Sequence, residues 1–384
     1  MSQPSAIVVG AGIVGLAMAR ALAMRGHRVT VLERHDHAVG ASIRNFGMIW
    51  PIGVGNGPEY QRALRSRQIW QELIDATGMW HDPCGSLHVA HADDEHDVLA
   101  QYAAANQGQR PCQLLDRAQT LARHPALVGE QLRGALFNAD ELVVDPREAI
   151  RTLPLYLQER HQVQFHWRTP VTAVGPGWAR SGQRRFQADQ VFVCSGPEFE
   201  QLYPELYANA PLTRCKLQMM RLATPSSNVT LGAALCGGLS LVHYPGFQQV
   251  TDLEPLRRRY QQQYPDLLDL GIHVMAAQNG LGQISIGDSH AYAHTHDPFD
   301  DATINQRILD YLRGFLHLPD LQLLQTWHGI YPKLTDGSRE FIVEAEPGVT
   351  VVNAVGGGGL GMTLSFGLAE ELVDGRYRQW RTAA

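Results

Sequence analysis

The fold of this chain is decided at its beginning, by the stretch Ala6-Ile7-Val8-Val9-Gly10-Ala11-Gly12-Ile13-Val14-Gly15 and by the Val29-Thr30-Val31-Leu32-Glu33 that follows it. The apolar run at residues 6–9 is typical of a short strand buried in a parallel sheet. Gly10, Gly12 and Gly15 complete the pattern G-x-G-x-x-G. The first glycine permits a tight turn, the second lets the backbone approach a pyrophosphate, and the third lets a helix pack closely on the strand.

The residues that follow complete a unit of strand, turn, helix and strand. A helix over residues 13–25 directs its free N–H groups and the positive end of its dipole at the phosphates. Gly26 ends that helix, and residues 29–32 form the second strand. Glu33 stands where an acidic side chain accepts a ribose hydroxyl. The unit therefore predicts a site for an ADP-containing dinucleotide, and it leaves open whether that is FAD or NAD.

Composition excludes several classes of protein. The 384 residues suffice for two domains or one large one, and the 44% of apolar residues can form a sizeable core. A net charge of -6 and a pI of about 6.3 argue against a general nucleic-acid binder. The first strand starts at Ala6 without a leader peptide, and no apolar run is long enough to span a bilayer. We therefore expect a cytoplasmic protein that neither spans a membrane nor binds nucleic acid.

Neither the cysteines nor the histidines show the spacing of a metal site. The five cysteines are widely separated, which favours reduced thiols over disulfides: Cys84, Cys112, Cys194, Cys215 and Cys236. Among the 17 histidines, His290, His294 and His296 share one polar stretch. A metal could bind there, but a solvated loop is the commoner structure for such a stretch, and no metal is expected.

A glycine-punctuated stretch at residues 40–51 mixes apolar and polar residues without a helical or strand period. It is too apolar for a free loop, so we expect it to wrap against the ligand. Ser42, Arg44 and Asn45 offer donors to phosphates or to the edge of a flavin ring. Further along, Asp145 followed by Pro146 predicts a helix over residues 146–160.

The other patterns divide the chain into a parallel and an antiparallel part. The predicted helices cover residues 59–78 and 93–106 and a short segment capped by Asp116, and the predicted strands cover residues 84–90, 162–167, 170–174 and 190–193. The last of these strands ends in Cys194-Ser195-Gly196, a small-residue turn that lets a second backbone segment approach a cofactor. Strands over residues 214–222, 239–244, 272–277 and 283–288, with a turn at Asn279-Gly280, then predict a mostly antiparallel sheet.

The end of the chain returns to ligand-binding character. A helix over residues 301–316 and a strand over 321–327 precede a turn-rich stretch, residues 328–337, that is typical of a ligand-binding loop. A buried strand over residues 349–355 leads to Gly356-Gly357-Gly358-Gly359-Leu360-Gly361, where a helix through Leu372 begins. A second glycine turn at a helix N-terminus predicts a second site for an anion or an oxyanion.

These motifs together resemble the FAD-dependent oxidoreductases of the glycine oxidase, sarcosine oxidase and D-amino-acid oxidase (DAO) type. The resemblance rests on Gly10-x-Gly12-x-x-Gly15 with Glu33, Gly40-Ala41-Ser42, Val144-Asp145-Pro146, Cys194-Ser195-Gly196, Tyr331-Pro332 with Thr335-Asp336-Gly337, and residues 356–361. It implies an α/β fold (α+β overall), in which a Rossmann-like FAD-binding domain is interrupted by a substrate domain on an antiparallel sheet, as in glycine oxidase. The FAD-binding domain would cover residues 1–82, 141–211 and 325–384, and the substrate-binding domain residues 83–140 and 212–324.

The same resemblance implies a set of cofactor-binding residues. Glu33 would hold the adenosine ribose, Val174 would meet adenine, and residues 357–363 would face the pyrimidine edge of the flavin. The full set is Gly10, Gly12, Ile13, Val14, Gly15, Glu33, Arg34, Ser42, Val174, Ser195, Gly196, Gly357, Gly358, Gly359, Leu360, Gly361, Met362 and Thr363. Sarcosine oxidases attach the flavin through a cysteine near the penultimate loop, whereas no cysteine follows Cys236 here, so the FAD is expected to be non-covalent.

Within the family, residues 44–51 look most like the subgroup associated with phosphonate breakdown. That subgroup is similar to enzymes acting on 2-aminoethylphosphonates, including N-methylated ones. The resemblance implies a small anionic amine as substrate, hydride transfer from the carbon beside nitrogen to flavin N5, and phosphonoacetaldehyde plus an amine as products. The electron acceptor would be O2 or another acceptor.

A phosphonate needs Arg or Lys donors, and the candidates follow from that requirement. The predicted substrate-binding residues are Arg44, Asn45, Lys216, Tyr331, Lys333 and Thr363, with Arg221 and Arg339 as further cations. No catalytic residue is certain because the flavin performs the chemistry, but Tyr331, His243, Asp288 and His290 could recognise or deprotonate the amine.

Two departures from the family pattern leave alternatives open. Tyr331 stands where carboxylate-binding members have an arginine, and Ser285 stands where sarcosine oxidases have an oxygen-activating lysine. An oxidase or dehydrogenase of sarcosine, glycine or another N-substituted or D-amino acid is one alternative. A flavoprotein subunit of a larger electron-transfer complex is a second. A tRNA-modifying flavoprotein is a third, which the acidic charge disfavours.

Overall fold

A six-stranded sheet is built around the first strand of the chain in the computed structural model, which describes residues 3–249 and 252–378. In spatial order its strands are β20 (Phe341–Glu346), β21 (Val349–Asn353), β13 (Gln190–Val193), β1 (Ser5–Val9), β2 (Arg28–Leu32) and β9 (Gln164–His166). All neighbours are parallel except β20 and β21. β1 therefore lies inside the sheet, which explains why residues 6–9 are uniformly apolar and buried.

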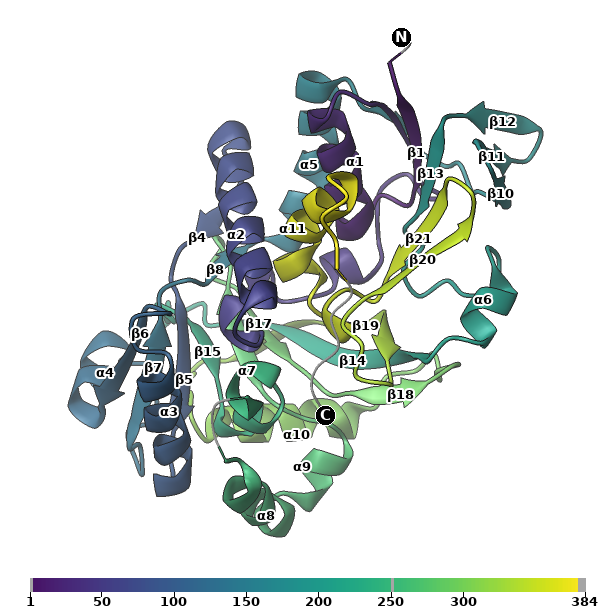
Figure 1. Ribbon diagram of the computed structural model, residues 1–384. Helices are drawn as coiled ribbons and strands as arrows, with labels where there is room; N and C mark the ends of the chain where they lie inside the picture. Colours follow the sequence, from purple (N-terminus) through teal and green to yellow (C-terminus); the bar gives the residue numbers. More distant parts are fainter. Residues whose placement is uncertain (1–2, 250–251, 379–384) are drawn as a thin grey trace.

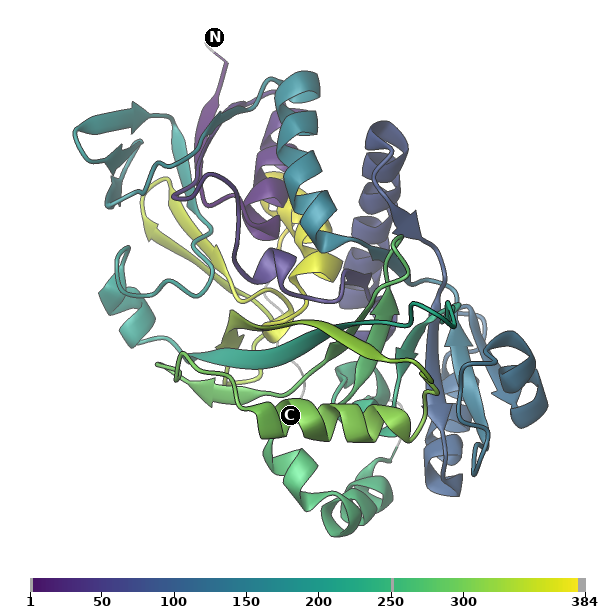
Figure 2. The ribbon, with the colours of Figure 1, turned by 180° about the vertical axis from the view of Figure 1, so that it is seen from behind.

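Four helices pack beside this sheet (Figures 1 and 2): α1 (Ile13–Met24), α2 (Pro58–Thr77), α5 (Pro146–His161) and α11 (Gly361–Val373). Trp70 of α2 is fully buried, lies edge-to-face with Phe366 of α11, and donates its indole N–H to the carbonyl of Met362 over 2.8 Å. These contacts of Trp70 fix the first turn of α11, which lines the cavity between the two halves of the molecule. A meander of β10 (Ala173–Gly175), β11 (Trp178–Ser181) and β12 (Arg184–Gln187) forms a separate three-stranded sheet.

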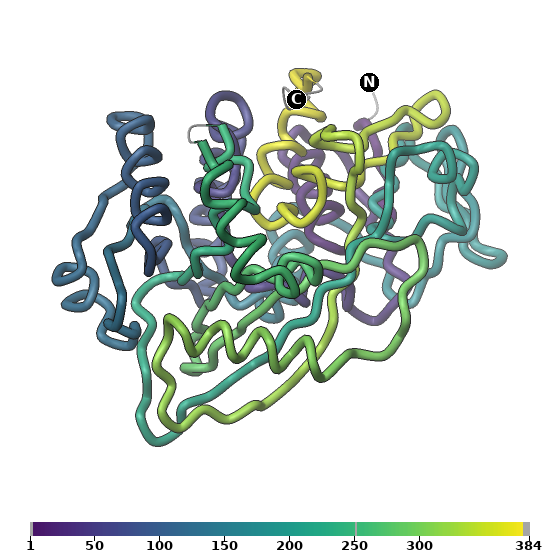
Figure 3. The backbone as a smooth tube through the Cα atoms, turned by 90° about the horizontal axis from the view of Figure 1, so that it is seen from below, coloured from purple at the N-terminus to yellow at the C-terminus, as the bar shows by residue number. Residues whose placement is uncertain are grey.

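The second large sheet has nine strands and forms the other half of the molecule, which Figure 3 shows from below. Its order is β18 (Ala291–Ala293), β14 (Leu212–Ala223), β17 (Ile284–Gly287), β16 (Met275–Gln278), β15 (Ala234–Cys236), β5 (Ser86–Ala90), β7 (Gly134–Asn138) and β6 (Cys112–Asp116), with β19 (Gln322–Leu334) also paired to β14. Every pair is antiparallel except β15 with β5. Its helices are α3 (Asp93–Ala105), α4 (Arg117–Arg123), α8 (Glu254–Gln263), α9 (Pro265–Asp269) and α10 (Ala302–Arg313).

Short elements connect the two halves. A small sheet joins β3 (Met48–Ile49), β8 (Leu142–Val144) and β4 (His81–Asp82). The remaining helices are α6 (Pro204–Ala208) and α7 (Pro245–Gln248), and the 3₁₀ turns are η1 (Ala41–Ile43), η2 (Pro51–Gly53), η3 (Gly238–Val242) and η4 (Val355–Gly357). No helix among the described residues has both the length and the apolar composition required to cross a membrane.

The fold class predicted from the sequence is confirmed, and so are the start signals of two helices. Asp145 caps α5 by accepting the N–H of Arg147 over 2.9 Å, and Asp116 caps α4 by accepting that of Gln119 over 2.8 Å. The predicted turn at Asn279-Gly280 joins the antiparallel strands β16 and β17. The residue bounds of the two domains stay a prediction.

Three local predictions were wrong. Residues 239–244 are not a strand, because the chain turns through η3 and then enters α7 at Pro245. Residues 328–337 are not a loop throughout, because β19 continues to Leu334. Pro332 is tolerated there because β19 pairs only with β14 within the described chain and so has an unpaired edge. The strand predicted at residues 170–174 begins three residues later, as β10.

Candidate active site

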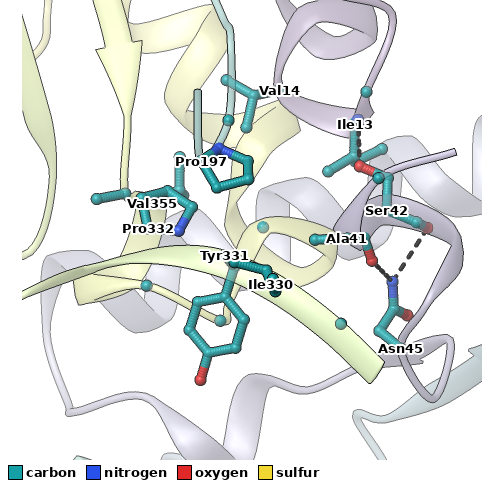
Figure 4. Close-up of a pocket in the computed structure, with 18 of the residues that line it drawn as sticks. Ile13, Val14, Ala41, Ser42, Asn45, Pro197, Ile330, Tyr331, Pro332 and Val355 are labelled. Atoms are coloured by element: carbon teal, nitrogen blue, oxygen red, sulfur yellow. Dashed lines mark hydrogen bonds between the residues drawn. The ribbon is translucent and has the colours of Figure 1, made fainter. Parts of the chain in front are cut away.

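A cavity of about 820 Å³ lies between the two halves of the molecule, at the carboxyl ends of β1, β2, β13 and β21. Open α/β sheets bind their ligands at that edge, and the volume is near the upper end for small-molecule sites. Figure 4 shows Ile13, Ser42 and Asn45 on one wall and Tyr331 on another. The cavity therefore joins the predicted dinucleotide turn to the antiparallel sheet.

The first glycine turn is shaped by close backbone contacts. Gly10 has φ +101° and donates its N–H to the carbonyl of Leu32 over 2.8 Å, and a Cβ there would lie 2.5 Å from the carbonyl oxygen of Cys194. A Cβ on Gly15 would lie 1.9 Å from the carbonyl oxygen of Gly10. Gly12 also lines the cavity but differs in its contacts, because a Cβ on it would meet only the Ser42 hydroxyl, at 3.1 Å. Gly10 and Gly15 thus shape the turn, and Gly12 leaves room for a ligand.

The wall around this turn offers both donors and an acceptor. Helix α1 begins at Ile13 without a side-chain cap on Gly12, so first-turn N–H groups other than that of Ile13 are left for a ligand. The Ser42 hydroxyl accepts the N–H of Ile13 over 2.9 Å, which fixes the stretch at residues 40–51 against the helix (Figure 4). Glu33 is buried, lines the cavity, and accepts the N–H groups of Ala11 and His35 over 2.9 and 3.0 Å. Its remaining lone pairs can accept ribose hydroxyls.

The second glycine turn approaches the cavity from the end of β21. Gly356, Gly357, Gly358 and Gly359 all have positive φ, from +68° to +107°. A Cβ on Gly358 would lie 2.4 Å from the carbonyl oxygen of Pro332, so only glycine lets this loop lie against β19. Helix α11 begins at Gly361 without a side-chain cap, as α1 does.

These observations decide which large cofactor the residues can hold. Two uncapped helix N-termini, two glycine turns and a buried acid line one long cavity, which is the donor and acceptor set of a dinucleotide. The turn at Ser195 and Gly196 closes the wall between them, since the Asn353 side chain donates to the Gly196 carbonyl over 2.9 Å. The residues present fit a dinucleotide such as FAD.

The far end of the cavity carries cationic and titratable groups. Lys333 lines it, and within the described residues its ammonium has neither a hydrogen-bond acceptor nor an ion-pair partner. Burial lowers the pKa of Lys333, and the charge of Arg339 lowers it further. Arg44 also lines the cavity and donates to the carbonyl of His328 over 3.2 Å. Tyr331 stays protonated, because burial raises the pKa of its hydroxyl well above the usual value.

Three histidines and one aspartate gather beside Lys333: His243, His273, His290 and Asp288, all of which line the cavity. Their nearest ring centroids, those of His243 and His273, are 3.8 Å apart. Burial lowers the pKa of all three imidazoles, that of His290 to about 4. Burial raises the pKa of Asp288 well above its usual range.

The structure places most predicted site residues on the cavity wall, including His243, Asp288, Tyr331, Lys333, Arg44 and Thr363. Asn45 lines it as well, but its amide donates to the carbonyls of Ala41 and Ser42, and its oxygen accepts the N–H of Gly47 (Figure 4). Thr363 accepts the N–H of Trp50 over 2.9 Å. Both side chains therefore hold the walls together.

Other predicted residues lie outside the cavity wall. The Lys216 ammonium faces away and binds the carbonyl of Asp297 and the carboxylate of Asp300, over 2.8 and 3.1 Å. Val174 belongs to β10, and Thr169, Pro170 and Val171 line the cavity in its place. Gly15, Gly357, Arg221 and Ser285 are also absent from the wall, and Arg221 donates to Ser285 over 3.1 Å. Lys216 and Val174 therefore do not line the cavity, and their roles as ligand contacts stay predictions.

Sequence reasoning missed His273 and Trp50, both of which line the cavity. His273 carries no local signal, since it stands alone between α9 and β16. The three loop histidines at 290, 294 and 296 do not converge, because only His290 reaches the cavity.

Comparison with known proteins identifies the family of this chain. Residues 5–375 match the family described as FAD dependent oxidoreductase, DAO. The chain is 29% identical over 235 residues to the glycine oxidase of Pseudomonas aeruginosa, which covers 56% of this chain and 61% of that protein. It is 32% identical over 244 residues to the bifunctional protein MnmC of Ectopseudomonas mendocina, which covers 60% of this chain and 35% of that protein. The chain thus spans less than two thirds of the length of either relative. One of the subunits of the opine oxidase of Agrobacterium tumefaciens is 23% identical over 98% of this chain and 95% of its own.

Solved structures show the same fold over nearly the whole chain. Glycine oxidase from Geobacillus kaustophilus superposes with a TM-score of 0.76 at 20% identity, over 97% of this chain and 95% of its own. The L-proline dehydrogenase from P. horikoshii superposes with a TM-score of 0.76 at 18% identity, over 98% of this chain and 95% of its own. At these identities the likeness establishes the fold alone.

Proposed function

This chain belongs to the DAO family of FAD-dependent oxidoreductases, and on that premise we propose that it oxidises the C–N bond of a small anionic amine. The bound flavin would supply the chemistry, by accepting the two electrons of the substrate C–H bond as a hydride. The chain itself binds and orients both molecules. Its apolar walls exclude water, and its charged end selects the substrate.

One observation carries the substrate class. Lys333 is a cavity-lining cation without a partner among the described residues, which is a costly arrangement unless an anion binds it. Arg44 also lines the cavity and still has donors to spare, since one guanidinium nitrogen bonds to the carbonyl of His328. An anionic group at one end of the amine would therefore be held at two cations.

Within the anionic amines, we propose 2-aminoethylphosphonate or its N-methylated form as the substrate. Two-electron oxidation would give an imine, which water hydrolyses to phosphonoacetaldehyde plus ammonia or methylamine. A phosphonate has three acceptor oxygens and more negative charge than a carboxylate, which suits a site with several dispersed donors. Tyr331 supports this choice, because it offers a single hydroxyl where carboxylate-binding relatives have a bidentate arginine. Lys333, Arg44 and Tyr331 would position the anion, and the amine would face the flavin.

The FAD is proposed to be non-covalent. Cys194 is the cavity-lining cysteine of the described chain, and burial raises the pKa of its thiol to about 12. A protonated thiol is a poor nucleophile, so a thioether bond to the flavin is not expected. Acid precipitation should release all the yellow colour into the supernatant, whereas a coloured pellet would contradict this point.

A second candidate substrate is glycine, sarcosine or another N-substituted amino acid. The glycine oxidase of Pseudomonas aeruginosa, 29% identical over 235 residues, favours it. The whole-length match to a protein named as one of the opine oxidase subunits favours a further interpretation, in which this chain serves within a larger complex. Turnover by the isolated chain with O2 would argue against a required partner.

The test is anaerobic reduction of the flavin by a panel of amines: aminoethylphosphonate, its N-methyl form, sarcosine, glycine and D-alanine. Bleaching by the phosphonates alone is the expected result, and bleaching by the carboxylated amines alone would refute the phosphonate assignment. The variant Lys333→Met should raise the concentration needed for half-maximal bleaching, by about tenfold to a hundredfold for one charge-assisted bond.

Lys216→Met is the matched control. Lys216 is a buried lysine on β14, the strand next to that of Lys333, but its ammonium bonds outside the cavity. The Lys216→Met variant should bind the substrate as the parent protein does. Equal losses in both variants would refute the role given to Lys333.

A further inference from the structure

The cluster of His243, His273, His290 and Asp288 has no assigned role in binding FAD. Its members come from three separate segments: the turn after η3, the connection before β16, and the chain just after β17. The donor atoms of the three histidines all lie within 4.8 Å of one another. His273, His290 and Asp288 are buried, and His243 opens toward the cavity.

The cluster is unsatisfied as a hydrogen-bonded network. Both ring nitrogens of His273 and Oδ1 of Asp288 are buried without a partner among the described residues. The distance from His273 Nε2 to Asp288 Oδ1 is 3.5 Å, which is too long for a hydrogen bond. An orphaned buried polar group costs about 1–3 kcal/mol, so a cluster of such groups calls for a ligand.

The same distance suits two ligands of one ion. Zinc bonds of about 2.0–2.2 Å at tetrahedral angles place neighbouring ligand atoms about 3.4 Å apart. The His273–Asp288 separation of 3.5 Å matches that spacing, and the 4.0 Å from His290 Nε2 to Asp288 Oδ2 is only slightly longer. The three histidines thus form one group of donors, and Asp288 adds a carboxylate beside two of them, His273 and His290.

Neighbouring groups also orient His290 as a ligand, and burial keeps all three histidines in the form that binds metal. His290 Nδ1 lies 2.9 Å from the carbonyl oxygen of Gly271. A carbonyl only accepts, so Nδ1 carries the proton and Nε2 keeps its lone pair toward Asp288. Metal-binding histidines are commonly oriented in this way, by a carbonyl on the other ring nitrogen. Burial favours the neutral imidazole in all three residues, which is the form that binds metal.

We propose that His243, His273, His290 and Asp288 bind one divalent transition-metal ion, such as Zn²⁺, at the substrate end of the cavity. Three imidazoles and one carboxylate are a donor set that zinc and its neighbours favour over magnesium or calcium. The ion would displace the proton that burial favours on Asp288, and with that carboxylate and neutral imidazoles the centre would keep one positive charge. The role that follows rests on the proposed function: beside Lys333, the ion would accept an anionic oxygen of the substrate as a fifth ligand.

The test measures metal directly on the FAD-loaded protein, prepared without a polyhistidine tag. Protein stripped with dipicolinate, incubated with Zn²⁺ and desalted should hold one zinc per chain by elemental analysis. Co²⁺ in place of zinc should give the intense ligand-field bands of a four- or five-coordinate site. A wild-type protein that retains no stoichiometric zinc would overturn the proposal.

Variants locate the ion. His273→Ala should lower zinc affinity by more than about 100-fold, the upper end for loss of a mere supporting residue. His243→Gln, at the partly exposed member, should abolish the Co²⁺ bands even if His273→Ala fails to fold. His294→Ala is the matched control, since His294 is an exposed histidine of the nearby loop outside the cavity wall. Equal zinc retention in His243→Gln and His294→Ala would overturn the assignment.

Substrate binding separates this inference from the proposed function. If stripped protein is still bleached by aminoethylphosphonate at unchanged half-saturation, the function stands and the metal's role in binding substrate fails. If zinc binds stoichiometrically but no anionic amine bleaches the flavin, the metal site stands and the proposed function fails.

Discussion

Replacing Gly12 by alanine separates the folding role of the first glycine turn from its ligand-binding role. Gly12 has φ -71° and ψ 175°, an extended conformation that alanine adopts without strain. The added Cβ would meet only the Ser42 hydroxyl, at 3.1 Å, and so disturb at most the bond that this hydroxyl accepts from Ile13. That bond is worth about 0.5–1.5 kcal/mol, which corresponds to a fall in Tm of a few degrees at most.

The effect on FAD should be much larger. The Cβ would stand on the cavity wall beside the first N–H groups of α1, where the pyrophosphate must approach. Each charge-assisted hydrogen bond lost is worth about 1.5–3 kcal/mol, or about tenfold to a hundredfold in the dissociation constant. Gly12→Ala should therefore fold normally and bind FAD at least about tenfold more weakly.

Gly15→Ala provides the contrast. Its Cβ would lie 1.9 Å from the carbonyl oxygen of Gly10, so α1 must shift off the sheet, and overpacking of this kind costs about 1–3 kcal/mol or more. Apoprotein melting curves and FAD titration by fluorescence quenching measure both effects. A Gly12→Ala protein with parental FAD affinity would refute the dinucleotide assignment of this turn. A Gly12→Ala apoprotein as unstable as Gly15→Ala would refute the division of roles.

Three further outcomes are expected. Arg62→Met should destabilise the protein by about 3–5 kcal/mol in urea unfolding, because the fully buried Glu340 and the nearby Glu371 would lose the guanidinium with which they form ion pairs. An unchanged unfolding midpoint would contradict this role of Arg62. Burial raises the pKa of Glu141 to about 7 in the folded protein. The free energy of unfolding should therefore fall by about 3 kcal/mol as pH rises from about 4.5 to 7, and the Glu141→Gln variant should show no such fall. Burial lowers the pKa of Lys333, so its positive charge is lost as pH rises through that lowered value. Above that pH inorganic phosphate should bind more weakly in calorimetric titration, and phosphate binding by Lys333→Met should lack this pH dependence.

The parts of the fold that follow from the sequence are those with strong local signals. The glycine turn after residues 6–9 fixes β1, α1 and β2, and Asp145 with Pro146 fixes the start of α5. The strand β19 could not be bounded in the same way. Residues 328–337 contain glycine and proline, which indicate a loop, but pairing with β14 from Leu212 to Ala223 keeps the chain extended to Leu334. Long-range pairing outweighed local preference there.

The candidate site also has one half that could be predicted from the sequence and one half that could not. Its cofactor half is built from glycines and helix N-termini, whose roles depend on backbone within a few residues, so Gly10, Gly12 and residues 358–363 could be found from the sequence. Its substrate half is built from single side chains of distant strands. His243, His273 and His290 are separated by 30 and 17 positions and carry no common spacing, so only the fold brings them together.

The two lysines show why strand register decides the substrate half. The two lysines stand on neighbouring antiparallel strands, and the sequence predicts both as substrate-binding residues. In the register of β14 with β19, Lys333 lies opposite Thr213, whereas Lys216 lies opposite Ile330. Side chains alternate between the faces of a strand, and directly opposed residues share a face. Ile330 and Lys333 are an odd number of positions apart, so the two lysines project from opposite faces of the sheet. A shift of one residue in the pairing would place both lysines on the same face. The register therefore places the Lys216 ammonium against Asp300 and Lys333 on the cavity wall, and the proposed anion-binding role of Lys333 depends on it.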